Sequence, residues 1–238
     1  MSQLASEGSK PVYSPGEVHE QAAALRGAAP EDIVRWALTT FPGKTALTVS
    51  FGGGGVVLAS MISQIDRTVP VIFLDTGFHF PETLEFKTRF VEKYGLNLIE
   101  MHPLTDPGPL YQTDPDACCG IRKVEPLQRA LTGFDAWISA VRGDQGSSRA
   151  GVEVVEYHES GGQPIVKVFP LAAWSRDDVW RYIREHDILY HPLLDQGFTS
   201  IGCWPCTRAT RPGEPERAGR WSGMGKTECG LHTFTTKV

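Results

Sequence analysis

The sequence lacks any long hydrophobic run, because no stretch of its 238 residues approaches 18 consecutive apolar residues. A membrane-spanning helix needs about 20 of them, so we expect no membrane association. The chain also lacks the cationic start and apolar segment of a secretion signal. These absences predict a cytoplasmic protein.

An excess of positive charge is missing too. Asp and Glu outnumber Lys and Arg by 28 to 23, which gives a formal net charge of -5. Nothing in this balance favours nucleic acid as a partner, and an anionic ligand must find a local basic patch. The five cysteines are an odd number, which argues against a secreted disulfide framework and favours metal or redox chemistry.

Internal repeats are absent, which favours one compact unit. Residues 1–16 are rich in Ser, Gly and Pro and predict a disordered lead. We expect an α/β nucleotide-binding domain over residues 17–206. Residues 207–238 carry glycine and proline at short intervals without an apolar period, and they predict a mobile carboxyl-terminal arm.

The fold class follows from alternating short strands and helices. Residues 45–51, 70–77 and 96–102 are β-branched and apolar runs separated by helical segments. Nearly continuous apolar runs are typical of strands buried on both faces of a parallel sheet. The pattern predicts a single Rossmann-like, doubly wound, mostly parallel α/β sheet with ligands at the carboxyl ends of its strands. Residues 152–158 and 164–170 predict a hairpin or an antiparallel edge. Residues 121–131 predict a short helix, and Ser175 with Asp178 three residues later forms a variant of the capping box that predicts the start of another helix.

Two motifs follow the first two strands. Ser50 to Gly55 reads SFGGGG, and its main-chain N–H groups could cradle a phosphate at the start of a helix. The run matches neither the P-loop nor the G-x-G-x-x-G pattern, and a flexible turn is the alternative. Leu74 to Gly77 reads LDTG, where Asp75 and Thr76 could bind a ribose or a base or could serve only turn chemistry.

The cysteines divide into four plus one. Cys118 and Cys119 are adjacent, and Cys203 and Cys206 form a C-x-x-C pair. Together they can supply four thiolates to zinc or to a cubane cluster, whereas a C-x-x-C alone could be a thiol-disulfide motif. Adjacent cysteines suit the separated corners of an iron-sulfur cubane better than tetrahedral zinc, while buried free thiols are the remaining alternative.

Cys229 stands alone in a locally basic segment, between Lys226 and His232. Because the thiolate is the reactive form and cations stabilise it, this cysteine is a candidate nucleophile. The candidate anion-binding cations are Arg142, Arg149, Arg208, Arg211, Arg217, Arg220 and Lys226. Solvated surface charge is the alternative for any one of them.

The segments CCGIRKVEPL, SIGCWPCT and ECGLH, in this order, closely resemble the assimilatory adenylyl-sulfate (APS) reductases of the phosphoadenylyl-sulfate (PAPS) reductase family. The resemblance runs from about Ser50 to His232 and includes ERAGRW at 216–221. It implies an adenine nucleotide alpha hydrolase-like fold and a 4Fe-4S cluster on Cys118, Cys119, Cys203 and Cys206. It also implies catalysis by Cys229 with Lys123 and His232, two candidate cations that would offset the negative charge of the sulfuryl oxygens. The implied substrate-binding residues are Ser50, Phe51, Gly52, Gly53, Leu74, Asp75, Thr76, Gly77, Arg142, Arg149, Arg217 and Arg220.

The family chemistry implies that the Cys229 thiolate attacks the sulfuryl sulfur of APS, so that AMP leaves and a cysteine S-sulfonate remains. Reduced thioredoxin or a glutaredoxin-like dithiol protein then releases sulfite, in sulfate assimilation and cysteine biosynthesis. Two departures from the family pattern do not touch this chemistry. SFGGGG stands where acidic residues are common, as in SFGAED, and Gly143 stands where a second arginine is usual.

Three other functions stay open. A PAPS reductase needs further cations for the 3'-phosphate, and its members usually lack the cluster cysteines. A tRNA thiolase would carry a Ser-Gly-Gly-x-Asp-Ser loop, which is missing here. A zinc-stabilised nucleotide-binding module would leave Cys229 without a role. The sequence leaves open whether the chain forms a homo-oligomer and which dithiol protein serves it.

Overall fold

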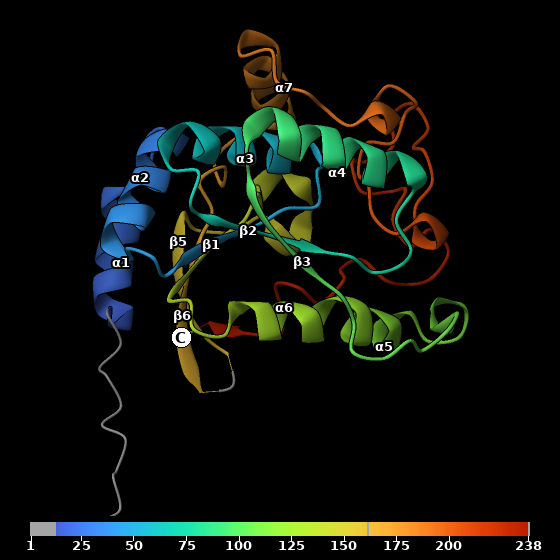
Figure 1. Ribbon diagram of the computed structural model, residues 1–238, viewed down its shortest axis with the longest axis horizontal. Helices are drawn as coiled ribbons and strands as arrows, with labels where there is room; N and C mark the ends of the chain where they lie inside the picture. The colour runs from blue at the N-terminus through green and yellow to red at the C-terminus, as the bar shows by residue number, and fades with distance from the viewer. Residues whose placement is uncertain (1–12, 161, 238) are drawn as a thin grey trace, which may run out of the picture.

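The computed structural model describes residues 13–160 and 162–237. Its centre is a seven-stranded sheet covered by helices on both faces, with α3 and α4 on one side and α5 and α6 on the other (Figure 1). The strand order is β3-β2-β1-β4-β6-β5-β7. The strands are β1 Thr45–Thr48, β2 Pro70–Leu74, β3 Asn97–Met101, β4 Ala136–Ile138, β5 Val155–Ser160, β6 Gln163–Val168 and β7 Thr236–Lys237.

The sheet is parallel from β3 to β6, and β5 and β7 form its antiparallel edge. This confirms the predicted α/β class, the mostly parallel sheet and the hairpin of β5 and β6. Parallel neighbours require crossover connections, which the helices provide. The strands β1, β2 and β4 are buried on both faces, as their apolar sequences predict.

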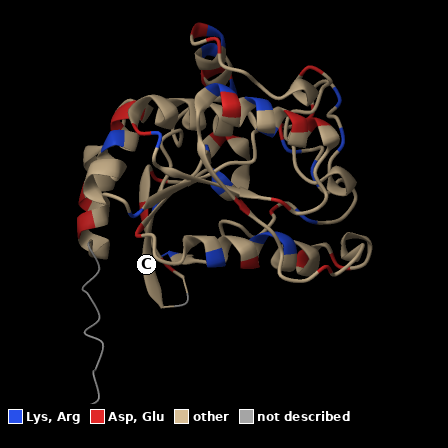
Figure 2. Ribbon diagram, in the orientation of Figure 1, with Lys and Arg blue, Asp and Glu red and all other residues tan. Residues whose placement is uncertain are grey.

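The helices begin at recognisable signals. They are α1 Pro15–Ala24, α2 Pro30–Thr40, α3 Gly53–Ile65, α4 Pro81–Tyr94, α5 Pro115–Cys119, α6 Glu125–Leu131 and α7 Arg176–Glu185. Ser175 accepts a hydrogen bond from the N–H of Asp178, whose side chain accepts one in return, so the predicted capping box of α7 is confirmed. Proline occupies the first turn of α1, α2 and α4, where its missing N–H costs nothing. Acidic and basic residues are interspersed along the helices (Figure 2).

Two boundaries differ from the sequence prediction. Residues 1–12 of the predicted lead lie outside the described residues, whereas Ser14 caps α1 and Pro15 already belongs to it. The helix predicted after Cys119 is preceded by α5 and by a π-helix over Gly120–Val124, so one continuous helical path joins Pro115 to Leu131. No helix among the residues described is long and apolar enough to cross a membrane.

The strand order places the ligand crevice. Strand β1 has β2 as its neighbour on one side and β4 as its neighbour on the other. Loops leaving β1 and β4 therefore diverge at their carboxyl ends, the position where open α/β sheets bind ligands. The two loops approach closely here, because a Cβ added to Gly54 would lie 3.2 Å from the Cβ of Ala140.

The carboxyl-terminal segment, residues 207–237, packs onto the body of the protein. Its Trp221 is only 2% exposed, and its last strand pairs with β5. Thr207 and Arg220 form an antiparallel bridge that folds the segment back beside the C-x-x-C pair. The predicted mobility of this arm stays a prediction, and its packed position sets the geometry of the site.

Candidate active site and metal centre

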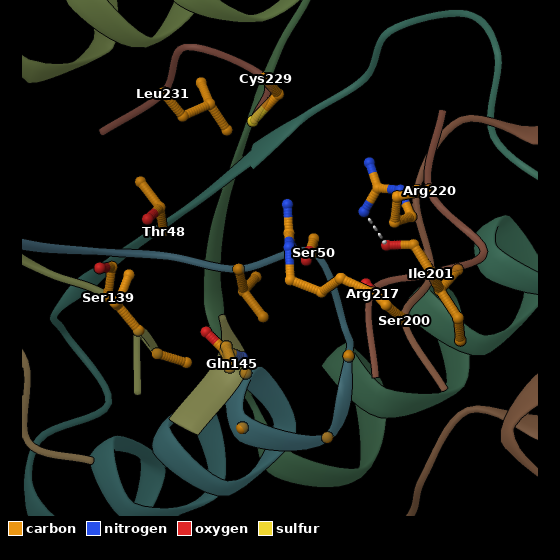
Figure 3. Close-up of a pocket in the computed structure, with 18 of the residues that line it drawn as sticks. Thr48, Ser50, Ser139, Gln145, Ser200, Ile201, Arg217, Arg220, Cys229 and Leu231 are labelled. Atoms are coloured by element: carbon orange, nitrogen blue, oxygen red, sulfur yellow. Dashed lines mark hydrogen bonds between the residues drawn. The ribbon is translucent and has the colours of Figure 1, made fainter. Parts of the chain in front are cut away.

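A cavity of about 230 Å³ opens at the carboxyl ends of β1, β2 and β4. Figure 3 shows Arg217, Arg220 and Cys229 from the carboxyl-terminal segment around the same cavity as Ser50 and Ser139 from the strand ends. The predicted site residues that line it are Ser50, Gly52, Gly53, Leu74, Thr76, Lys123, Arg142, Arg149, Cys203, Arg217, Arg220, Cys229 and His232. Segments that are far apart in the chain thus meet at one opening.

The glycine-rich turn offers main-chain groups to this cavity. Helix α3 starts at Gly53 after the N-cap Gly52, and no side chain caps it. Its first N–H groups therefore stay available to an anion, as predicted. Phe51 differs, because its ring is fully buried against Phe73 in the core, which leaves only its backbone to contact a ligand.

The LDTG segment is divided between two roles. Leu74 and Thr76 line the cavity, whereas Asp75 and Gly77 are not among its lining residues. The Oδ1 atom of Asp75 instead accepts a hydrogen bond from the N–H of Gly77 at 2.9 Å. The structure therefore gives these two residues the turn chemistry that was the alternative for this segment. The hydroxyl of Thr76 lies 3.3 Å from the sulfur of Cys203 and joins the cavity to the cysteines.

The two arginines of the loop after β4 are both paired with carboxylates. Arg142 is buried and donates from Nε to Asp144 at 2.9 Å and from Nη2 to Glu216 at 2.6 Å. Arg149 forms two hydrogen bonds with Glu228. Arg142 therefore braces the loop against the carboxyl-terminal segment while it also lines the cavity, and its contact with substrate stays a prediction.

Lys123 and Arg220 bring positive charge to the cysteine side of the cavity. Lys123 is buried, and burial lowers its pKa, but the thiols of Cys203 and Cys229 raise it more, so the pKa lies above its usual value. This amine is therefore charged at neutral pH. Arg220 donates to the carbonyl of Ile201 at 3.2 Å (Figure 3) and lies over the ring of Trp221.

His232 is neutral in the protein. Its ring stacks on Trp137 with centroids 5.0 Å apart, and burial lowers its pKa well below the usual 6.5. The expected positive charge at this position is wrong, because the nearby cations Lys167 and Arg149 lower this pKa further. Its Nδ1 atom has no hydrogen-bond partner within the described part of the chain. A neutral imidazole with one unpaired nitrogen therefore faces the site.

The four predicted ligand cysteines line one small cavity next to the first. Cys118, Cys119, Cys203 and Cys206 are all buried and form no disulfide. The adjacent pair ends α5, and the C-x-x-C pair flanks a 3-10 turn at Trp204–Cys206. Cys229 is buried too, but it lines only the larger cavity.

This thiol set fits a metal group. Burial raises the pKa of Cys119 to about 11 and that of Cys118 and Cys206 above their usual value. A metal that replaces the protons would make these buried groups thiolates, and Arg122 and Lys123 line the same cavity to offset the negative charge. The structure thus holds a buried four-cysteine centre that is compatible with an iron-sulfur cluster.

Several cavity residues escaped the sequence analysis. Ser139 directly follows β4 and has a buried hydroxyl without a partner within residues 13–160 and 162–237. Gln145 accepts hydrogen bonds from Arg142 and Arg149 and braces the arginine loop. Neither residue belongs to a sequence motif that predicts a function. Only their position after β4 could have indicated that they line the site. Thr199 and Ser200 complete the wall.

Comparisons with known proteins agree with this geometry. Residues 44–209 match the phosphoadenosine phosphosulfate reductase domain. The chain is 44% identical to adenosine 5'-phosphosulfate reductase of Deinococcus radiodurans, over 99% of this chain and 94% of that protein. The protein of the same name from Streptomyces coelicolor is 42% identical, over 87% of this chain and 90% of its own.

A crystal structure of a phosphoadenylyl-sulfate reductase from Candida auris superposes with a TM-score of 0.73 at 32% identity, covering 82% of this chain and 98% of that one. The family match spans strands β1 to β6, the glycine-rich turn and all four cysteines of the buried centre. This protein therefore belongs to the phosphoadenosine phosphosulfate reductase domain family.

Proposed function

We propose that this protein is an adenylyl-sulfate reductase that converts APS to sulfite and AMP with electrons from a reduced dithiol protein. The observation that carries the proposal is the place of Cys229. It is the one cysteine that lies outside the four-thiol cavity, and it lines the larger cavity beside Lys123 and Arg220. Relatives with the name adenosine 5'-phosphosulfate reductase cover nearly the whole chain and support the same substrate.

The first step is nucleophilic attack by the Cys229 thiolate on the sulfuryl sulfur of APS. A sulfur–sulfur bond forms, the bond between the sulfur and the bridging oxygen breaks, and AMP leaves with the electron pair. Lys123 and the arginines Arg149, Arg217 and Arg220 line the cavity and would stabilise the sulfuryl and phosphate oxygens. His232 would donate or accept a hydrogen bond at the reacting groups as a neutral imidazole.

The nucleotide would lie along the carboxyl ends of the strands. The uncapped start of α3 supplies N–H groups, and Ser50, Leu74 and Thr76 provide the walls of a nucleoside site. A 4Fe-4S cluster on the four buried cysteines would supply structural and electrostatic support beside this site. The five unpaired thiols favour a reducing compartment, so we place the reaction in the cytoplasm.

The second step needs a partner. A thiolate of reduced thioredoxin or a glutaredoxin-like protein attacks the Cys229 sulfur and releases sulfite, and its second thiol resolves the mixed disulfide, so the partner ends oxidised. Because Cys229 is only 9% exposed, a protein dithiol cannot reach it in the packed position. The carboxyl-terminal arm must therefore open between the two steps.

Sulfite release with APS, compared with PAPS, tests the proposal. The anaerobically purified protein with reduced thioredoxin should convert APS with a much higher kcat/KM than PAPS. The second candidate function is PAPS reduction, which the Candida auris neighbour favours by its own name. Equal or better kcat/KM with PAPS would establish that candidate instead.

A further inference from the structure

Glu228, the residue before Cys229, is held at both carboxylate oxygens. Arg149 donates from Nε to Oε1 at 3.0 Å and from Nη2 to Oε2 at 2.9 Å. Ser148 donates its hydroxyl to Oε1 at 3.0 Å, and Arg217 donates from Nη2 to Oε2 at 3.2 Å. One side chain thus joins the loop after β4 to the carboxyl-terminal segment.

The carboxylate lies behind the cavity rather than in it. Arg149 and Arg217 both line the cavity, and Glu228 is not among its lining residues. A substrate anion could therefore contact the arginines on one side while Glu228 keeps its hydrogen bonds on the other. Only 21% of the Glu228 side chain is exposed, so solvent screens these interactions weakly.

The two arginines need this partner. Burial, and then the charge of Arg149, lower the pKa of Arg217 to about 10, and Glu228 opposes both effects. Without the carboxylate, two guanidinium groups would face one another and repel. Their orientation toward the cavity therefore depends on Glu228.

The same contacts fix the nucleophile. Nη2 of Arg217 also donates to the carbonyl of Thr227 at 3.2 Å, so Arg217 holds the two residues before Cys229, one at its main-chain carbonyl and the other at its carboxylate. Cys229 follows directly and is 9% exposed at the cavity. Movement of Glu228 would displace the sulfur and the arginines together.

We infer that Glu228 is a positioning residue that couples the placement of Cys229 to the orientation of Arg149 and Arg217. The inference rests on the proposed function for its substrate, and it deepens that function by naming what aligns the nucleophile with the anion-binding cations. Alignment of this kind matters because a displacement of about 1 Å can cost about 100-fold in rate. A salt bridge with only a structural role would change stability and leave this alignment untouched.

The test compares Glu228→Gln with Glu214→Gln. Glu214 is a matched control, because it lies in the same segment and also accepts two hydrogen bonds from one arginine, Arg208, away from the cavity. Two rate constants are measured for each variant and for the wild type. The first is alkylation of Cys229 by iodoacetamide without substrate, read by peptide mass spectrometry on the high-pH plateau so that ionisation does not enter. The second is single-turnover formation of the Cys229 S-sulfonate from APS.

Glu228→Gln should change these rate constants in opposite directions. Release of Cys229 should raise its alkylation about 10-fold or more, because charged hydrogen bonds are lost. Misalignment should lower S-sulfonate formation about 10- to 100-fold at unchanged iron content. Glu214→Gln should match the wild type in both. Glu228→Asp keeps the charge and should lie between, and it supplies the comparison if the glutamine variant does not fold.

The inference is overturned if Cys229 in Glu228→Gln is alkylated at the wild-type rate, or if this variant forms the S-sulfonate at an undiminished rate. Equal effects of the two glutamine variants overturn it as well. The proposed function fails separately, because a wild-type protein that forms no S-sulfonate from APS refutes that function. The alkylation comparison needs no substrate and still decides whether Glu228 holds Cys229.

Discussion

Replacement of Gly219 by alanine tests how the carboxyl-terminal segment positions its arginines. Gly219 lies where this segment passes over the residues after the C-x-x-C pair, and its carbonyl accepts a hydrogen bond from the N–H of Arg208 at 2.9 Å. A Cβ on Gly219 would lie 2.2 Å from the carbonyl oxygen of Arg208, whereas ordinary contacts begin at 3.4 Å. The obstacle is backbone, so the two strands of chain must separate by about 1 Å.

The expected size of the effect follows from this separation. Arg217 and Arg220 flank Gly219 and line the cavity, so a shift of the segment moves both guanidinium groups. Forced overpacking costs about 1–3 kcal/mol of stability. A displacement of about 1 Å at positioned groups costs about 100-fold in rate. We therefore expect Gly219→Ala to lower kcat/KM for APS about 100-fold and to lower the free energy of unfolding.

The assay is sulfite release at subsaturating APS, with denaturant unfolding of the same samples. Gly151→Ala is the control, because a Cβ at Gly151 meets no atom within 4 Å. It should match the wild type in both measurements. The argument from close approach is refuted if Gly219→Ala keeps kcat/KM within twofold of the wild type and its unfolding midpoint within experimental error.

Other predictions concern the thiols and one buried amine. Cys229→Ser should keep the iron and lose sulfite release by several orders of magnitude, because a hydroxyl is a poor nucleophile at neutral pH; substantial turnover by this variant would contradict the assignment. Cys203→Ser should remove iron, measured by metal analysis, together with activity; stoichiometric zinc in a fully active wild type would argue against the cluster. Burial lowers the pKa of Lys167 from its usual 10.5 to about 8, so the unfolded chain binds more protons between these values. The free energy of unfolding should therefore rise by about 3 kcal/mol from pH 8 to pH 10.5, and this gain should be lost again as the pH falls toward 8. Denaturant unfolding across this range measures the pH dependence, and Lys167→Met should abolish it.

Much of the fold could be predicted because its signals are local. The runs that form β1 and β2 are apolar over consecutive residues, and burial on both faces of a parallel sheet requires that pattern. Ser175 and Asp178 predict the start of α7, because a capping box is formed by residues three positions apart in the sequence. The division of the cysteines was also readable, since adjacency and the C-x-x-C spacing are properties of the sequence.

What only the tertiary structure decided depends on segments that are distant in the chain. Arg142 reads as a cation in the sequence, but its carboxylate partner Glu216 lies 74 residues away, and only the folded segment shows that the two side chains form an ion pair. His232 reads as a cation until its stacking on Trp137 buries it and makes it neutral. Glu228 belongs to the ECGLH segment, but that segment does not reveal its role, because the role depends on Arg149, 79 residues earlier in the loop after β4. Residue types and spacing thus determine which chemistry is available, whereas burial and long-range pairing decide which side chains remain charged, unpaired and aligned to use it.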